Sequence, residues 1–289
     1  MKIKLITDST SDLSREFANQ SDVAVIPFIY QMNGVEYADD FGQSMPHEEF
    51  YARLGRGEMA STSQINPYQF EQYFETYLKQ GYSVLYIAFS SGMSSTYQNA
   101  VVAQNTLRNK YPDASILAFD SKTACAPQEM IINEAIRLMK LDLDIVSIAN
   151  QLEAYKATIG TYFIVDDLNH LARGGRISNT SAMLGYMMEV KPILTLNDGK
   201  IVSVAKVRGR KKALNELVER FKIESDPHKQ TVYIHHSASE GDVELLKTRL
   251  LECENVSAVV VNPMGPIIGS HTGPRAVNIG YLRSNVTHG

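Results

Sequence analysis

One pattern recurs along the first half of the chain: a short apolar segment, then a turn rich in serine, threonine and aspartate, then a segment with helical periodicity. It occurs at residues 3–7 before 8–12, at 84–89 before 90–95, and at 115–119 before 120–121. Continuous apolar strands that alternate with helices favour a parallel sheet covered on both faces. Ligands of such sheets bind beyond the carboxyl ends of the strands, so we expect a site at these polar turns.

The sequence changes in character near residue 158. Beyond it, residues 192–196 and 200–207 flank Asn197-Asp198-Gly199, a turn typical of an antiparallel hairpin. Because 289 residues suffice for two domains, we predict a two-domain α/β protein. Residues 1–158 would form an α/β domain with a parallel sheet, and residues 159–289 a second α/β domain with a mixed or antiparallel sheet.

Two local signals in the first half are strong. Asn33-Gly34 predicts a hairpin within residues 25–37. Asn66, with Pro67 after it and Gln69 at the capping-box position, predicts the start of a helix that runs to about residue 80. The hydroxyl-rich segment 60–64 before that helix is expected to be a loop.

Charge and cysteine content exclude several classes of protein. The net charge of −4 argues against nucleic-acid binding. Cys125 and Cys253 lie far apart without a Cys/His cluster near either, so neither a disulfide framework nor a zinc site is expected. His235 and His236 point to opposite faces of a predicted strand, which disfavours a metal site there. We expect no cofactor, no metal, and a soluble protein of a reducing cytoplasm, because no signal peptide or membrane-spanning run is present.

Two hydroxyl-rich segments could bind an anion. In residues 90–98, Ser95 and Gln98 have capping-box spacing, which would direct the amides of a helix N-terminus and several hydroxyls into one pocket. The alternative is a well-capped helix with spare serines. If residues 61–64 faced that turn, their hydroxyls could bind the same anion, for example a carboxylate. Otherwise they form an ordinary loop.

Basic residues cluster in residues 173–176 and 206–212, and one histidine, His271, lies among glycines and prolines. A solvated surface explains most such runs. A more specific interpretation is phosphate recognition. The planar guanidinium groups of Arg176 and Arg208 are better suited to it than the ammonium group of a lysine. His271 is either a packed histidine or part of a site.

Taken together, these segments resemble the DegV family, whose members bind fatty acids. The resemblance covers nearly the whole chain and rests on seven segments in order, which are residues 7–13 (TDSTSDL), 62–64 (TSQ), 91–98 (SGMSSTYQ), 174–177 (GGRI), 191–194 (KPIL), 206–212 (KVRGRKK) and 269–274 (GSHTGP). It implies a fatty acid held in a slot between the two domains. It also implies a non-catalytic role in bacteria as the binding subunit of a fatty acid kinase, whose separate ATP-binding subunit makes acyl phosphate.

The resemblance assigns roles to individual residues. Thr62 and Ser94 look like the hydroxyls that bind the carboxylate, with Ser63 and Gly92 beside them. Ser95 stands where many relatives have glycine and adds a hydroxyl at that site. The residues that look like the polar rim, in contact with the phosphate or the kinase, are Arg176, Arg208 and His271.

The acyl slot needs apolar walls. Burial of about 0.8 kcal/mol per methylene gives a chain of about 14 to 18 carbons on the order of 10 kcal/mol before association costs. Candidates for the wall, each of which could equally be ordinary core, are Met183, Leu184, Met187, Met188 and Ile267. Alternatives are a fatty acid store or transporter without a kinase partner, and a serine hydrolase using Ser94 and His271. Transient contact with a membrane surface stays open.

Overall fold

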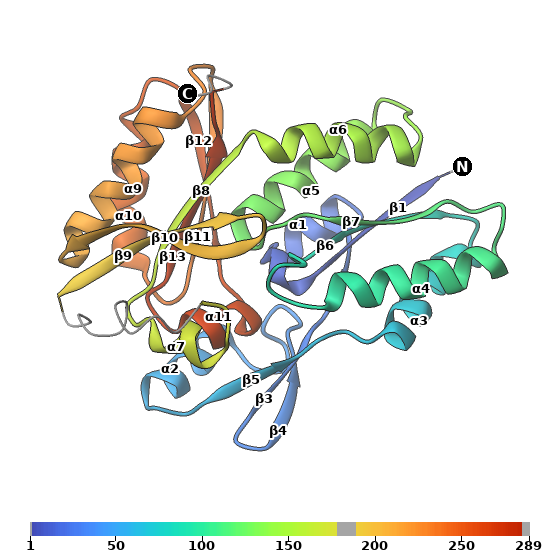
Figure 1. Ribbon diagram of the computed structural model, residues 1–289, viewed down its shortest axis with the longest axis horizontal. Coiled ribbons are helices and arrows are strands. Elements are labelled where there is room, and N and C mark those ends of the chain that lie inside the picture. The colour runs from blue at the N-terminus through green and yellow to red at the C-terminus, as the bar shows by residue number, and fades with distance from the viewer. Residues whose placement is uncertain (1, 178–188, 285–289) are drawn as a thin grey trace.

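The computed structural model describes residues 2–177 and 189–284 of the chain (Figure 1). Its first sheet is parallel throughout, with strand order β2-β1-β6-β7. The strands are β1 (Ile3–Asp8), β2 (Ala24–Ile26), β6 (Ser83–Ala88) and β7 (Ile116–Asp120). Every residue of β6 is buried, as a central strand covered on both faces requires. The parallel sheet predicted from the apolar segments is confirmed.

Helices cover both faces of this sheet. Their bounds are α1 (Arg15–Gln20), α3 (Pro67–Leu78), α4 (Thr96–Lys110), α5 (Cys125–Met139) and α6 (Ile145–Ala157). Phe70 and Phe74 of α3 pack on Tyr86 of β6, while Met130 and Ile131 of α5 pack on the other face. Across both described ranges, no helix is apolar over the length that crossing a bilayer requires.

A small antiparallel sheet, ordered β4-β3-β5, extends from this layer. It consists of β3 (Ile29–Met32), β4 (Val35–Ala38) and β5 (Ala60–Ser63), and α2 (His47–Gly55) links β4 to β5. Positive φ angles of 51° at Asn33 and 79° at Gly34 make the predicted hairpin turn. The loop predicted at residues 60–64 is wrong, because β3 offers a free edge and residues 60–63 pair with it antiparallel.

The second half forms a six-stranded mixed sheet, in the order β10-β9-β8-β13-β11-β12. Only β11 and β12 pair in parallel, which confirms the predicted mixed sheet. The strands are β8 (Ile159–Ile164), β9 (Val190–Asn197), β10 (Lys200–Arg208), β11 (Gln230–His236), β12 (Val256–Pro263) and β13 (Val277–Leu282). The helices are α7 (Asn169–Arg173), α9 (Arg210–Glu224), α10 (Glu240–Leu251) and α11 (Pro266–Thr272), and α9 and α10 cover one face of the sheet (Figure 1).

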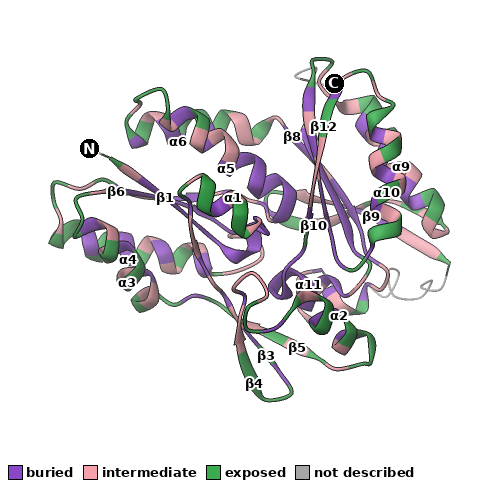
Figure 2. Ribbon diagram, turned by 180° about the vertical axis from the view of Figure 1, so that it is seen from behind, coloured by how far each residue is buried: buried purple, intermediate pink, exposed green. Residues whose placement is uncertain are grey.

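The helix α5 lies between the parallel sheet and the six-stranded sheet, and much of it is buried (Figures 1 and 2). It touches β1 and β6 on one side and β11 and β13 on the other. Residue 158, where the sequence analysis divides the chain, lies between α6 and β8. The division into two domains at that residue stays a prediction.

The tip of the β9–β10 hairpin packs on the turn that follows β6. Ser90 Oγ donates a hydrogen bond to the Gly199 carbonyl at 2.8 Å, and Lys122 Nζ lies 3.2 Å from an Asp198 carboxylate oxygen. Gly92 lies so close to this tip that a Cβ on it would be 2.5 Å from the Gly199 carbonyl oxygen. The two halves of the chain therefore meet through a contact that only glycine at position 92 permits.

Gly92→Ala should destabilise the protein by about 1–3 kcal/mol, because the added methyl group must displace the hairpin backbone. The matched control is Gly241→Ala in α10, where a Cβ would meet nothing within 4 Å. That change should alter stability by no more than about 0.5 kcal/mol, because Gly241 lies in the first turn of α10 and is exposed. Urea unfolding measures both, and equal stability of Gly92→Ala and wild type would contradict the contact.

Candidate functional site

A cavity of about 400 Å³ lies between the two halves of the chain. That volume is in the range of small-molecule sites, which are typically about 300–1,000 Å³. Most of its wall is apolar and comes from both halves, including Phe28, Phe89, Met93, Phe163, Leu171, Leu196, Ile201, Met264, Ile267 and Ile268. Ile267, predicted as a slot residue, is among them and is 3% exposed.

One part of the wall is polar, and it gathers most of the head-group residues that the sequence predicts. Seven of the eight line the cavity, namely Thr62, Ser63, Gly92, Ser94, Ser95, Arg176 and His271. They come from β5, the turn before α4, the segment after α7, and α11. The alternation of β5 turns Thr62 inward between the exposed Ser61 and Ser63.

Thr62 and His271 are hydrogen-bonded to each other at this wall. Thr62 Oγ1 lies 2.9 Å from His271 Nε2. Burial, and then the charge of Arg176, lower the pKa of His271 to about 4, so its ring is neutral at pH 7. Its Nδ1 is buried without a hydrogen-bond partner, and we therefore assign the single N–H to Nε2. Thr62 then accepts from His271 and keeps its own hydrogen to donate into the cavity.

Gly174 closes the other side of the histidine ring. A Cβ at this position would overlap His271 Nδ1. The glycine in the Gly-Gly-Arg segment thus gives His271 the room to face Thr62.

Ser94 is positioned by the start of α4. Its Oγ accepts a hydrogen bond from the Thr96 amide at 3.2 Å and lies 2.8 Å from Thr96 Oγ1. When Thr96 donates in both contacts, the Ser94 hydroxyl hydrogen remains for a ligand. The capping box predicted from Ser95 and Gln98 is wrong, because Ser95 makes no side-chain cap and Ser94 accepts the amide instead.

Arg176 is held by backbone carbonyls rather than by acids. Its Nε donates to the Met93 carbonyl at 3.1 Å, and Nη1 donates to the Gly174 carbonyl. These bonds place the positive charge of Arg176 beside the turn that carries Ser94.

A second, more polar cavity of about 280 Å³ adjoins the first. Both cavities are lined by Thr62, Arg176 and His271. The second cavity is also lined by His170 and by Arg173, whose side chain is exposed. A group bound at the wall is therefore close to a polar space that carries positive charge.

Other predicted residues lie elsewhere. Arg208 ends β10, where it pairs with Glu189, its side chain is 76% exposed, and it does not line the cavity. Four predicted slot residues, Met183, Leu184, Met187 and Met188, lie outside the described residues.

Most of the apolar wall was not predicted from the sequence. Phe28 and Phe89 face each other edge to face, with ring centroids 6.3 Å apart, and Leu196 and Ile201 flank the tip of the β9–β10 hairpin. Phe89 ends the apolar segment before the polar turn, which is a signal that could have been read. Cys125, at the start of α5, also lines the cavity and was not predicted.

Comparison with known proteins places this architecture in a defined group. A sequence model described as "Uncharacterised protein, DegV family" matches residues 2–284. A DegV domain-containing protein of Clostridium perfringens is 38% identical over 283 residues, which is 97% of each chain. A structure described as fatty acid binding of a DegV family protein from Thermus thermophilus is 29% identical, with a TM-score of 0.89 over 98% of this chain and 100% of that one. A fatty acid binding DegV family protein from Streptococcus agalactiae is 31% identical, with a TM-score of 0.85 over 99% and 100%.

The neutral state of His271 should make stability depend on pH. Its folded pKa of about 4 lies below the ordinary 6.5, so between these values the unfolded chain binds more protons and the free energy of unfolding rises with pH. Acidification through this window should therefore cost the wild type more stability than it costs His271→Gln, which takes up no proton. Urea titrations across the window measure the two slopes, and equal slopes would contradict a buried neutral ring.

Proposed function

Since the chain belongs to the DegV family, we propose that it buries one long-chain fatty acid in the cavity between its two halves. The carboxylate rests on Thr62 and Ser94, with His271 orienting Thr62. In this proposal the protein is a non-catalytic carrier of its ligand.

The observation that carries this proposal is an apolar cavity with one polar wall made of neutral donors. An acyl chain gains free energy only where a dry space excludes water from its methylenes. A buried carboxylate needs hydrogen-bond donors, because an unpaired buried charge is very costly. Thr62 and Ser94 each keep a hydroxyl hydrogen for such a ligand, and the neutral His271 supports one of them.

The related structures support the same ligand class. The Thermus thermophilus and Streptococcus agalactiae proteins, which share this fold over nearly their full lengths, are both described as fatty acid binding. Their sequence identities of 29% and 31% lie above the range in which fold alone is shared.

A serine hydrolase is the weaker alternative. It would need His271 to act as a base oriented by an acid. Within the described residues, however, His271 Nε2 is bonded to Thr62 and Nδ1 has no partner. Ser94 is engaged with Thr96. The arrangement favours binding over hydrolysis.

We further propose that the bound carboxylate is offered to a separate ATP-binding kinase subunit. A carboxylate oxygen would attack the γ-phosphorus of ATP, ADP would leave, and acyl phosphate would form. The polar second cavity supports this proposal, because Thr62, Arg176 and His271 line it as well as the apolar cavity. Arg176 and Arg173 there could offset phosphate charge.

Thr62→Val should weaken fatty acid binding. The variant keeps the shape of threonine but loses a hydrogen bond to a charged group, which is worth about 1.5–3 kcal/mol, or about 10- to 100-fold in affinity. Thr62→Ser keeps the hydroxyl and should bind nearly as wild type does. Competition between a fluorescent fatty acid and palmitate or oleate measures the three affinities.

Two results would contradict the binding proposal. One is a wild-type protein that yields no fatty acid on organic extraction and mass spectrometry, and that ignores added palmitate and oleate. The other is equal affinity of Thr62→Val and wild type, which would remove Thr62 from the carboxylate site.

The kinase proposal predicts that lipid binding and phosphorylation separate. Arg176→Ala and Arg208→Ala should retain most fatty acid binding yet reduce ATP-dependent acyl phosphate formation. Arg176 lies beside the proposed carboxylate site, and Arg208 is exposed and could contact a partner. Arg137→Ala is the matched control for Arg208, because Arg137 is also an exposed arginine paired with a glutamate. Trapping acyl phosphate with hydroxylamine, with the kinase subunit of the same organism present, measures the rates.

Equal loss of lipid binding in Arg176→Ala and Thr62→Val would contradict this separation of roles. If no ATP-binding partner is captured from lysate and none supports acyl phosphate formation, the protein stores or transports fatty acid without a kinase.

A further inference from the structure

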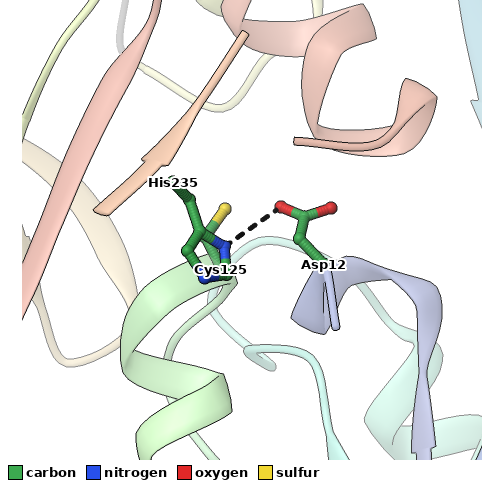
Figure 3. A group of neighbouring side chains, drawn as sticks. All are labelled: Asp12, Cys125 and His235. Carbon is green, nitrogen blue, oxygen red and sulfur yellow. Dashed lines mark ion pairs between the residues drawn. The ribbon is translucent and has the colours of Figure 1, made fainter. Parts of the chain in front are cut away.

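A buried cluster of three potential metal ligands lies where the two halves of the chain meet. Asp12 follows β1, Cys125 begins α5, and His235 lies near the end of β11 (Figure 3). One ligand atom from each residue lies within 4.8 Å of the other two, and all three residues are buried. Asp12 and Cys125 have positive φ angles of 51° and 53°, a conformation that is uncommon for a residue other than glycine.

Two polar atoms in this cluster face each other without a partner. Asp12 Oδ2 and His235 Nδ1 are both buried and make no hydrogen bond. They are 3.8 Å apart, which is too long for a hydrogen bond. Tetrahedral coordination by zinc places an oxygen and a nitrogen ligand about 3.3–3.5 Å apart. A small inward shift of the two side chains would bring these atoms to the separation that a shared metal ion requires.

The outer contacts of His235 are those of a metal-bound histidine. His235 Nε2 lies 2.7 Å from a Glu129 carboxylate oxygen, and Asn262 Nδ2 donates to the same oxygen at 2.9 Å. A carboxylate that accepts the far N–H of a histidine fixes the tautomer in which the other nitrogen is free to ligate. Here that other nitrogen is Nδ1, which points at Asp12.

Within the described ranges, no lysine or arginine lies against the acids of this cluster. Asp12 and Glu129 are both buried. Asp12 Oδ1 accepts one hydrogen bond, from the Gly265 amide at 2.7 Å. A third buried acid, Asp39, lies nearby, and burial followed by the charge of Asp12 raises its pKa well above the usual value. Buried acids are costly, and a divalent ion would balance the charges of the Asp12 carboxylate and a Cys125 thiolate.

We propose that Asp12, Cys125 and His235 bind a zinc ion that links the two halves of the chain. Oxygen, sulfur and nitrogen in one set match a metal of borderline softness. Cys125 also lines the large cavity, which gives the ion an access route and leaves a fourth coordination position for water. The site is separate from the Thr62–His271 wall, so the acyl proposal neither requires it nor fails with it.

Zinc binding to the full-length wild type tests the proposal directly. Protein stripped with a chelator and dialysed against Zn²⁺ should retain a single ion per chain by elemental analysis. The Co²⁺ form should show near-ultraviolet absorption from thiolate-to-metal charge transfer. A wild-type chain that retains no stoichiometric zinc overturns the proposal, whatever the variants do.

Three variants assign the ligands. Cys125→Ser should abolish the cobalt–thiolate absorption, while Cys253→Ser, which removes the other free cysteine, should leave it unchanged. Glu129→Gln keeps every proposed ligand and should weaken zinc affinity by about 10- to 100-fold, as loss of an outer-shell carboxylate does. Persistence of the thiolate band in Cys125→Ser, or its loss in Cys253→Ser, would overturn this ligand set.

Discussion

The cavity exists because two parts of the chain, far apart in sequence, are held together through buried polar contacts. Glu129 on α5 accepts hydrogen bonds from His235 on β11 and Asn262 on β12, and Asp12 accepts one from Gly265 just before α11. Each of these groups would be costly to bury without its partner. Separating the two halves would remove all of these partners at once. Through the last contact the position of α11, and with it His271, is tied to the parallel sheet.

The position of α11 matters because the proposed ligand places two opposing requirements on the cavity. An acyl chain requires a dry space, while its carboxylate requires solvation. The fold meets both by facing the apolar side chains of β8, β9 and α11 toward the same cavity as the turn before α4. Arg176 is fixed by two backbone carbonyls, so in the proposed function its charge would stabilise the carboxylate from nearby while hydroxyls would supply the direct contacts. A carboxylate held in this way keeps its oxygens less tightly engaged than a bidentate arginine pair would.

Signals that depend on neighbouring residues could be read from the sequence, and signals that depend on distant ones could not. Asn33-Gly34, Asp198-Gly199 and the Asn66–Gln69 capping box are local, and the structure contains each. The strand at residues 60–63 forms only because β3 offers an edge. The helix α11 begins at the proline of a Gly-Pro pair, a pair that is typical of loops, yet proline is well tolerated in the first turn of a helix. Thr62 and His271 are separated by 209 positions, so only the family resemblance could suggest that they share a site.

The two sides of the cavity are held with unequal strength. At the α5 side, His235 is fully buried and Glu129 is 3% exposed, so water screens their ion pair little. At the hairpin side, the Lys122–Asp198 pair includes an aspartate side chain that is 81% exposed, and such pairs contribute about 0–1 kcal/mol. Separation of the halves at α5 would leave buried charges without their partners. Movement of the hairpin tip breaks only one Ser90 hydrogen bond and one weak ion pair among the contacts described above. The β9–β10 hairpin, which carries Leu196 and Ile201, is therefore the side of the cavity that can move at least cost.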